Sequence, residues 1–194
     1  ERLVPEAGEF QRIALSATIR PLDTVASLVG GYSVENAETS YTAREVVCID
    51  APGSKQISLD IRYGGEEDQG GDSIWKTLSL ELKRRILEHE STLIFVNSRR
   101  LAERLTHLIN SDGDRIAYAH HGSLSKEVRH VVETRMKQGE LKSIISTSSL
   151  ELGIDIGNLD RVLMVDSPFT VSSAVQRIGR SGHSVGEESK ATIY

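Results

Sequence analysis

The stretch that decides the fold is Ser146–His183, which reads STSSLELGIDIGNLDRVLMVDSPFTVSSAVQRIGRSGH. Its second half carries Gln176, Arg177 and Arg180. On a helix, which turns by about 100° per residue, these side chains fall within an arc of roughly 100°. Apolar side chains fall on the opposite side: Val171, Ala174, Val175 and Ile178. One face of such a helix can pack on a core, while the other directs two guanidinium groups at an anion such as phosphate.

Patterns typical of strands and helices alternate from residue 56 onward. Uninterrupted apolar runs predict strands that are buried on both faces: Leu93–Val96, Ile144–Ile145 and Val162–Val165. Further strands are predicted at 57–63, where every second residue is apolar, giving one buried face, and at 115–119 and 191–194. Helices are predicted from a Ser73 N-cap, up to Asn110, from a Ser125 N-cap, and through Gln176. This alternation predicts an α/β fold with a parallel sheet and helices on both faces.

Polar residues follow three of the predicted strands. They are Asn97-Ser98-Arg99, His121-Gly122-Ser123 and Ser146-Thr147-Ser148. In a parallel sheet, groups just past the carboxyl ends of the strands line one edge, where ligands bind. Hydroxyls, amides and helix N-termini at that edge can hold phosphates. The sequence therefore predicts a polar groove along one edge of the sheet.

The first fifty residues follow a different pattern. Arg12–Thr18 (RIALSAT) is an apolar run that ends in hydroxyl residues, which predicts a buried strand with an exposed loop at its end. A helix is predicted over Leu22–Val29 and a short buried strand over Val46–Ile49. A Pro-Gly pair then breaks the chain. We therefore expect one domain at 1–53 and a second at 54–194.

Composition excludes several classes of protein. No apolar run is long enough to span a membrane, and the first residues lack the basic start and apolar block of a secretory signal. Cys48 is the only cysteine, so an internal disulfide and a cysteine-based zinc site are excluded, and we expect a cytoplasmic setting. The net charge of −5 argues against a generally basic nucleic-acid-binding surface but leaves room for a local basic strip.

The ordered motifs of the chain resemble those of superfamily 2 helicases. Leu15–Thr18 (LSAT) is similar to motif III at the end of a first RecA-like lobe, and Thr92–Arg100 (TLIFVNSRR) is similar to motif IV. Ser146–Gly157 (STSSLELGIDIG) resembles motif V, and Gln176–His183 (QRIGRSGH) resembles motif VI. Within the superfamily, the spelling HHGSLSKE…SSLELGIDIG…QRIGRSGH is most similar to the large helicase-related (Lhr) ATP-dependent helicases.

The resemblance implies that 1–53 is the end of the first RecA-like lobe and that 54–194 is a truncated second lobe. Arg177 and Arg180 would then reach ATP as arginine fingers and stabilise charge on the transferring γ-phosphate, with Gln176 assisting in the same cleft. Asp155 would meet the ribose, and Gly153 would leave room for the backbone to approach. ATP and Mg²⁺ would be bound mainly by the first lobe.

The resemblance also implies a path for one strand of nucleic acid. Six residues would contact the strand's backbone: Asn97, Ser98, Arg99, His121, Gly122 and Thr147. Ser16 and Thr18 would couple the state of ATP to the grip on the strand across the cleft. The expected partners are single-stranded or partly duplex nucleic acid, with DNA favoured over RNA, and the first RecA-like lobe, with no membrane.

Two departures from the family pattern limit what this chain can do. It contains neither a GxxxxGK[ST] motif nor an acidic DExH or DEAD box, both of which belong to the first lobe. It therefore lacks the Lys that holds the β- and γ-phosphates and the acidic group that holds Mg²⁺, so the chain alone should not hydrolyse ATP at a useful rate. His183 stands where many relatives have Arg, so no third guanidinium is assumed.

Simpler interpretations stand beside these. Arg177 or Arg180 can cap helix carbonyls or pair with a carboxylate, and Asp155 can cap a turn. His120 and His121 have no third ligand nearby in the sequence, so a metal site is not favoured. The basic run Lys83–Arg85 is more simply a solvated helix face than a nucleic-acid contact. The whole chain can also be a non-catalytic RecA-like scaffold or a single-strand-binding module.

Overall fold

The computed structural model describes residue 4 and residues 8–16, 19–35, 40–49, 56–62, 71–151, 154–182 and 188–194. By its internal contacts the chain forms two compact units, Glu1–Gly53 and Ser54–Tyr194. Each unit has a sheet of its own.

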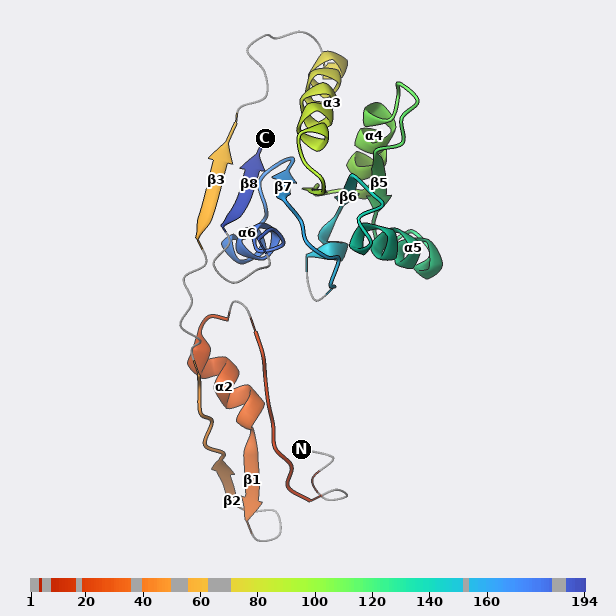
Figure 1. Ribbon diagram of the computed structural model, residues 1–194. Coiled ribbons are helices and arrows are strands. Elements are labelled where there is room, and N and C mark those ends of the chain that lie inside the picture. Colours follow the sequence, from red (N-terminus) through yellow and green to blue (C-terminus); the bar gives the residue numbers. More distant parts are fainter. Residues whose placement is uncertain are drawn as a thin grey trace. The chain divides into compact units, whose positions relative to one another are not determined.

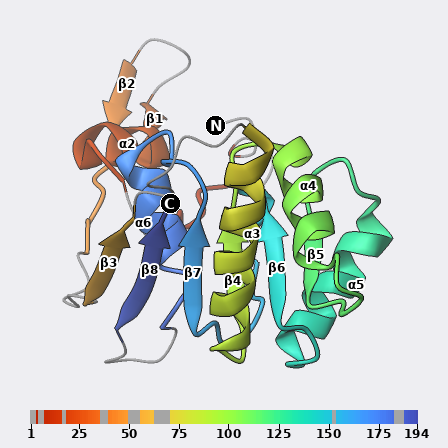
Figure 2. The same cartoon turned by 90° about the horizontal axis from the view of Figure 1, so that it is seen from above.

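The second unit is built on a six-stranded sheet. Its strands, in spatial order, are β3 (Ile57–Ile61), β8 (Ser189–Ile193), β7 (Arg161–Met164), β4 (Thr92–Phe95), β6 (Ser143–Ser146) and β5 (Ala117–His120) (Figure 1 and Figure 2). Every neighbouring pair is parallel, and Leu93 lies opposite both Ile144 and Val162. The predicted parallel sheet is confirmed, and each of its strands lies within about two residues of a predicted strand.

Helices cover both faces of this sheet. α3 (Gly71–Leu87) and α4 (Arg99–Ile109) pack on one face, and α5 (Lys126–Lys137) and α6 (Val171–Ile178) pack on the other. Figure 2 shows α3 in front of β4. Successive residues of β4 enter opposite cores, Phe95 with Met136 and Ile178, and Ile94 with Ile86. Because β4 is buried on both faces, its sequence is almost continuously apolar, and the predicted α/β class is confirmed.

Hydroxyl side chains set where three helices begin. Ser98 caps α4, Ser125 caps α5 and Thr170 caps α6, each by accepting a hydrogen bond from a backbone N–H at 3.2, 3.3 and 3.1 Å. Each cap satisfies one of the N–H groups that a helix leaves unpaired at its start. The predicted Ser125 cap is confirmed. The predicted Ser73 cap is wrong, because α3 already begins at Gly71.

Strand β3 lies at the edge of the sheet and pairs on one side only, with β8. Its apolar residues Ile57, Leu59 and Ile61 are all exposed. The predicted strand is confirmed, but the prediction of one buried face is wrong, because neither apolar core extends to β3. Tyr63, the last residue of the predicted alternation, lies outside the described residues.

In the first unit, the described residues form α2 (Leu22–Gly30) and an antiparallel pair, β1 (Tyr32–Glu35) and β2 (Ser40–Ala43). The predicted helix is confirmed: Pro21 precedes it, and Gly31 ends it with φ +59°. Neither β1 nor β2 was expected from the sequence. Their residues YSVE and SYTA mix hydroxyl and charged side chains with apolar ones and give no apolar run.

The two strands predicted in the first unit are wrong where the structure describes them. Residues 12–16 and 46–49 form no strand, and Leu15 is 94% exposed. A buried strand needs neighbours on both sides, and β1 and β2 pair only with each other. Within the described part of the chain, no helix is long and apolar enough to cross a membrane.

Candidate functional site

The loops that follow four of the parallel strands meet at one edge of the sheet. After β6, Thr147 N donates a hydrogen bond to His120 O at the end of β5 (3.2 Å). After β4, Asn97 Nδ2 donates to Ser167 O, which follows β7 (3.0 Å). The structure therefore brings the residues predicted to contact a strand to one rim, as the topology of a parallel sheet requires.

Ser98, Arg99 and Gly122 are exposed on this rim. Arg99 Nη1 donates to Ser123 Oγ (2.8 Å), and a Cβ placed on Gly122 would meet no atom within 4 Å. A cation and an open stretch of backbone suit a phosphate group. The neighbouring Ser98 differs, because its hydroxyl already caps α4.

His120 and His121 are both buried. His120 Nε2 lies 2.8 Å from Glu133 Oε1, and its Nδ1 lies 2.8 Å from Ser149 Oγ. Burial lowers the pKa of His120, and the Glu133 carboxylate acts in the opposite direction. His121 Nε2 lies 2.8 Å from Glu103 Oε1, while its Nδ1 is buried and has no hydrogen-bond partner among the described residues. The predicted contact of His121 with a strand therefore depends on Nδ1.

Arg177 is buried, and side chains of its own unit hold its guanidinium. The residue is 2% exposed. Its Nε donates to Glu151 Oε2 (3.0 Å), and its Nη1 donates to Asn97 Oδ1 (3.3 Å). Its Cζ lies 5.1 Å from the centre of the Phe95 ring, a cation–π distance. The anion nearest to Arg177 is thus a carboxylate of the same unit.

The helix that carries Arg177 differs from the prediction. α6 ends at Ile178, so Arg180 lies beyond the helix and shares no helical face with Arg177. Val171, predicted on the buried side, is 81% exposed. The prediction of one outward arginine face and one inward apolar face is wrong, because only the C-terminal end of α6 is buried and the Glu151 carboxylate draws Arg177 inward.

Arg180 is half-buried and binds the segment after β6. Its Nη1 donates to Ile154 O (2.9 Å), and its Nη2 donates to Glu151 O (2.9 Å). Burial lowers the pKa of Arg180, while the charge of Glu151 raises it. Among the described residues its hydrogen bonds go to backbone carbonyls, which carry no full charge. The charge of Arg177 is neutralised by the carboxylate to which it is hydrogen-bonded. The charge of Arg180 has no such carboxylate among its described hydrogen bonds, so a phosphate can neutralise it.

Asp155 is exposed and forms a local turn. Its Oδ1 accepts a hydrogen bond from Gly157 N (3.1 Å), and its Oδ2 pairs with Lys137 Nζ of α5. A ribose hydroxyl at Asp155 would compete with Lys137. Over the described ranges, no three His, Cys, Asp or Glu side chains gather into a group that could hold a metal ion.

The remaining predicted site residues are placed only in part. Gln176 is half-buried on α6, and Ser16 is exposed in the first unit. Thr18 and Gly153 lie outside the described residues. Their roles stay predictions.

Sequence reasoning gave no role to Glu133, Lys137 and Arg129, and it favoured a solvated or capping role for Glu151 in place of the ion pair with Arg177. Among the described residues, Arg129 Nε is buried without a hydrogen-bond partner. A signal for Glu151 was present, because it is the single charge between Ser146 and Ile154. A charge in such a stretch, once buried, needs an opposite partner.

Gly182, in the QRIGRSGH string, has a backbone that only glycine adopts readily. Its φ is +64°, and a Cβ there would lie 2.8 Å from Glu188 O. We expect Gly182→Ala to lower the free energy of unfolding by about 1–3 kcal/mol, measured by urea denaturation. The matched control is Gly122→Ala, which has open space for its Cβ. Equal losses for the two variants would contradict the assignment.

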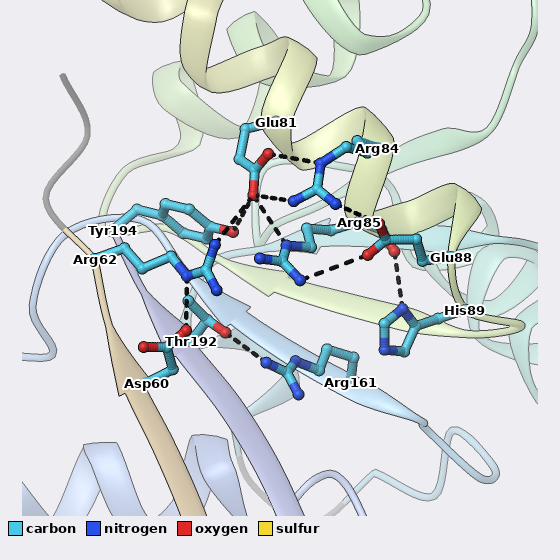
Figure 3. Close-up of polar contacts among 10 residues, drawn as sticks. All are labelled: Asp60, Arg62, Glu81, Arg84, Arg85, Glu88, His89, Arg161, Thr192 and Tyr194. Carbon is cyan, nitrogen blue, oxygen red and sulfur yellow. Dashed lines mark hydrogen bonds and ion pairs between the residues drawn. The ribbon is translucent and has the colours of Figure 1, made fainter. Parts of the chain in front are cut away.

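A second polar cluster lies apart from the rim, between α3 and strands β3 and β8 (Figure 3). Glu81 Oε1 accepts hydrogen bonds from Arg84 Nη2 (2.7 Å) and Arg85 Nε (2.9 Å). The Arg84 and Arg85 guanidinium groups hold the pKa of Glu81 at about 2. The basic run Lys83–Arg85 thus has acidic partners within the chain, in line with a helix face rather than a nucleic-acid contact.

This cluster predicts loss of stability in acid. The pKa of Glu81 is about 2 in the fold against 4.5 for the free group, so the unfolded chain binds more protons between these values. The contribution of Glu81 is present above about pH 4.5 and is lost as the pH falls toward 2. We expect Glu81→Gln to cost about 1 kcal/mol at pH 7 and to lose less stability than the wild type between pH 4.5 and 2. Urea unfolding at several pH values measures both, and parallel curves for the two proteins would contradict the assignment.

Comparison with known proteins gives a match to one family and to a similar relative. The family of helicase conserved C-terminal domains matches residues 75–184. The ATP-dependent helicase Lhr-Core protein 2 of Thermococcus barophilus is 41% identical over 203 residues, which cover 100% of this chain and 22% of the relative. The chain therefore spans about a fifth of the length of the curated relatives it matches first.

Two solved structures are similar to the chain. The Mycobacterium smegmatis helicase Lhr bound to ssDNA and AMP-PNP is 39% identical with a TM-score of 0.74, covering 92% of this chain and 23% of that one. The S. cerevisiae protein Dbp5 bound to RNA and ADP BeF3 is 25% identical with a TM-score of 0.57, covering 72% of this chain and 34% of that one.

Proposed function

Because the chain belongs to the family of helicase conserved C-terminal domains, we propose that it is the second motor lobe of an ATP-dependent nucleic-acid helicase or translocase. The predicted RecA-like fold and the resemblance to Lhr-type helicases are confirmed. The observation that carries the proposal is Arg180, a half-buried guanidinium in the QRIGRSGH string whose described partners are uncharged carbonyls.

Arg180 is half of a nucleotide site in this proposal. ATP, when bound, supplies the phosphoryl group whose transfer drives the motor. Arg180 would exchange the carbonyls of Ile154 and Glu151 for γ-phosphate oxygens, and Asp155 would exchange Lys137 for a ribose hydroxyl. Gln176 belongs to the same cleft, and Gly153 leaves room for the backbone to approach. Arg177 would reach the phosphate only after its pair with Glu151 opens.

The rest of the nucleotide site lies in a first RecA-like lobe. Residues 1–53 are proposed as the end of that lobe and residues 54–194 as the second lobe. The sequence contains no GxxxxGK[ST] motif, so the first lobe would supply most of the contacts to ATP and Mg²⁺. Ser16 and Thr18 would report the state of ATP to the strand-binding rim. A cytoplasmic location, where the single Cys48 stays reduced, belongs to the same proposal.

The rim at the carboxyl ends of the strands is proposed to hold one strand by its backbone. Arg99 and the open backbone at Gly122 would meet phosphates, with Thr147 and His121 Nδ1 beside them. Asn97 would take part through its backbone or its second side-chain N–H, and Ser98 would take part through its backbone or its hydroxyl hydrogen. DNA is favoured over RNA, because the more similar of the two solved neighbours is bound to ssDNA.

This function is tested by measuring ATP hydrolysis by the whole protein with and without ssDNA. We expect ssDNA to stimulate its ATP hydrolysis, and we expect the 194-residue chain alone to have no such activity. Arg99→Ala should weaken ssDNA binding and reduce the slope of log K against log salt concentration by about one. Arg135→Ala is the control, because Arg135 pairs with Glu140 and is no part of the rim. A whole protein whose ATP hydrolysis does not respond to nucleic acid would refute the proposal.

A further inference from the structure

The buried arginine of the QRIGRSGH string joins three segments that are far apart in the sequence. Arg177 Nε binds the Glu151 carboxylate, and Arg177 Nη1 binds the Asn97 side chain. The side chains of Arg177 and Glu151 are 3% and 13% exposed. Moving a buried, paired guanidinium away from its carboxylate costs much free energy, since both charges would be left without a partner.

Glu151 is held at two points by two different arginines. Its carboxylate accepts from Arg177, and its backbone carbonyl accepts from Arg180 Nη2. Arg180 also binds Ile154 O, three residues farther along the same segment. The direction of the Arg180 guanidinium therefore depends on where Glu151 lies, and Arg177 fixes Glu151.

Asn97 connects the same arginine to the rim. Its Oδ1 accepts from Arg177, and its Nδ2 donates to Ser167 O after the neighbouring strand β7. Asn97 directly precedes Ser98, which begins α4, and Arg99, which is exposed on the rim. Rotation of Arg177 would therefore disturb the rim and the Arg180 segment together.

We propose that Arg177 is a positioning residue that holds Arg180 and the strand-binding rim in one arrangement through Glu151 and Asn97, and that it does not contact ATP. The inference rests on the proposed function of the lobe. It assigns to Glu151 a part in the transfer of information between nucleotide and strand, because both arginines bind this residue: Arg177 binds its carboxylate, and Arg180 binds its backbone carbonyl. It also divides the two arginines: Arg180 acts on the phosphate, and Arg177 acts through Glu151.

The test compares Arg177→Lys and Glu151→Gln in the whole protein. Lysine keeps the charge but cannot reach Glu151 and Asn97 as a fork, and glutamine keeps the shape of Glu151 without its charge. We expect each variant to lower kcat with saturating ssDNA about 10-fold, to change the KM for ATP by less than about 2-fold, and to reduce the stimulation by ssDNA. The kcat of the double variant should be no lower than that of the poorer single variant, since both changes break the same contact between Arg177 and Glu151.

The control is the exposed pair Arg135–Glu140, which has the same Nε–Oε2 distance of 3.0 Å as the buried pair. Arg135→Lys and Glu140→Gln should leave kcat and the stimulation unchanged. If Arg177 were itself a finger, Arg177→Lys would be far more harmful than Glu151→Gln, and that result would overturn the proposal.

Two further outcomes distinguish a failure of the positioning role from a failure of the proposed function of the lobe. Variants that melt at a lower temperature but keep the full stimulation by ssDNA would show a merely structural pair and would also overturn the proposal. A wild-type protein without any stimulation would refute the function of the lobe itself, and the positioning role with it.

Discussion

Arg180→Ala in the whole protein should lower ssDNA-stimulated ATP hydrolysis by about 10³-fold or more, because an arginine finger contributes roughly 10³–10⁵ to the rate. Arg180 is the arginine of the QRIGRSGH string whose described hydrogen bonds go to carbonyls rather than to a carboxylate. Its charge is then available where negative charge develops on the transferring phosphate. The KM for ATP should change far less than kcat, since the first lobe would supply most of the binding.

Arg180→Lys is the informative companion to this variant. It keeps a positive charge but loses the planar fork that binds two oxygens at once, so its rate should lie between those of the wild type and Arg180→Ala. Arg135→Ala, an exposed arginine paired with Glu140, should keep the wild-type rate. A rate for Arg180→Ala within a few-fold of wild type would show that Arg180 is not a finger.

The sheet was predictable from sequence because burial on both faces leaves a local mark. β4 and β6 are fully buried, and their apolar residues are consecutive, so strand type and place follow from a few residues. The same rule failed in the first unit, where the apolar residues Ile13, Ala14 and Leu15 are exposed and the observed strands β1 and β2 contain no apolar run. Local hydrophobicity reports burial only where a neighbouring layer exists to provide it.

The rim was predictable for a topological reason, whereas the contacts of each side chain were not. Residues after parallel strands reach one edge whatever their partners are. The direction of the Arg177 side chain, however, is set by Glu151, which is 26 residues away in the sequence. The Asp155 carboxylate is likewise bound by Lys137, which is 18 residues away. Helical periodicity alone predicted that Arg177 points outward. Periodicity considers only the residues of one helix, so it cannot foresee an ion pair with a carboxylate on another segment.

Phe95→Ala should lower the free energy of unfolding of the second unit by about 3–5 kcal/mol, the usual cost of removing a buried aromatic ring. Phe95 is 0% exposed and packs in the core that includes Met136 and Ile178. Its ring also lies 5.1 Å from the Arg177 guanidinium carbon, so truncation removes apolar contacts and a cation–π contact together.

Urea denaturation followed by tryptophan fluorescence measures this loss directly, because Trp75 is the only tryptophan and lies on α3 of the second unit. The matched control is Leu59→Ala on the edge strand β3, where the side chain is already exposed and the cost should stay below about 1 kcal/mol. Phe95→Leu should fall between the two, since it keeps most of the apolar volume but loses the ring. Similar losses of unfolding free energy for Phe95→Ala and Leu59→Ala would mean that β4 is not the centre of the core. The Phe95 ring would then not be a rigid surface on which Arg177 packs.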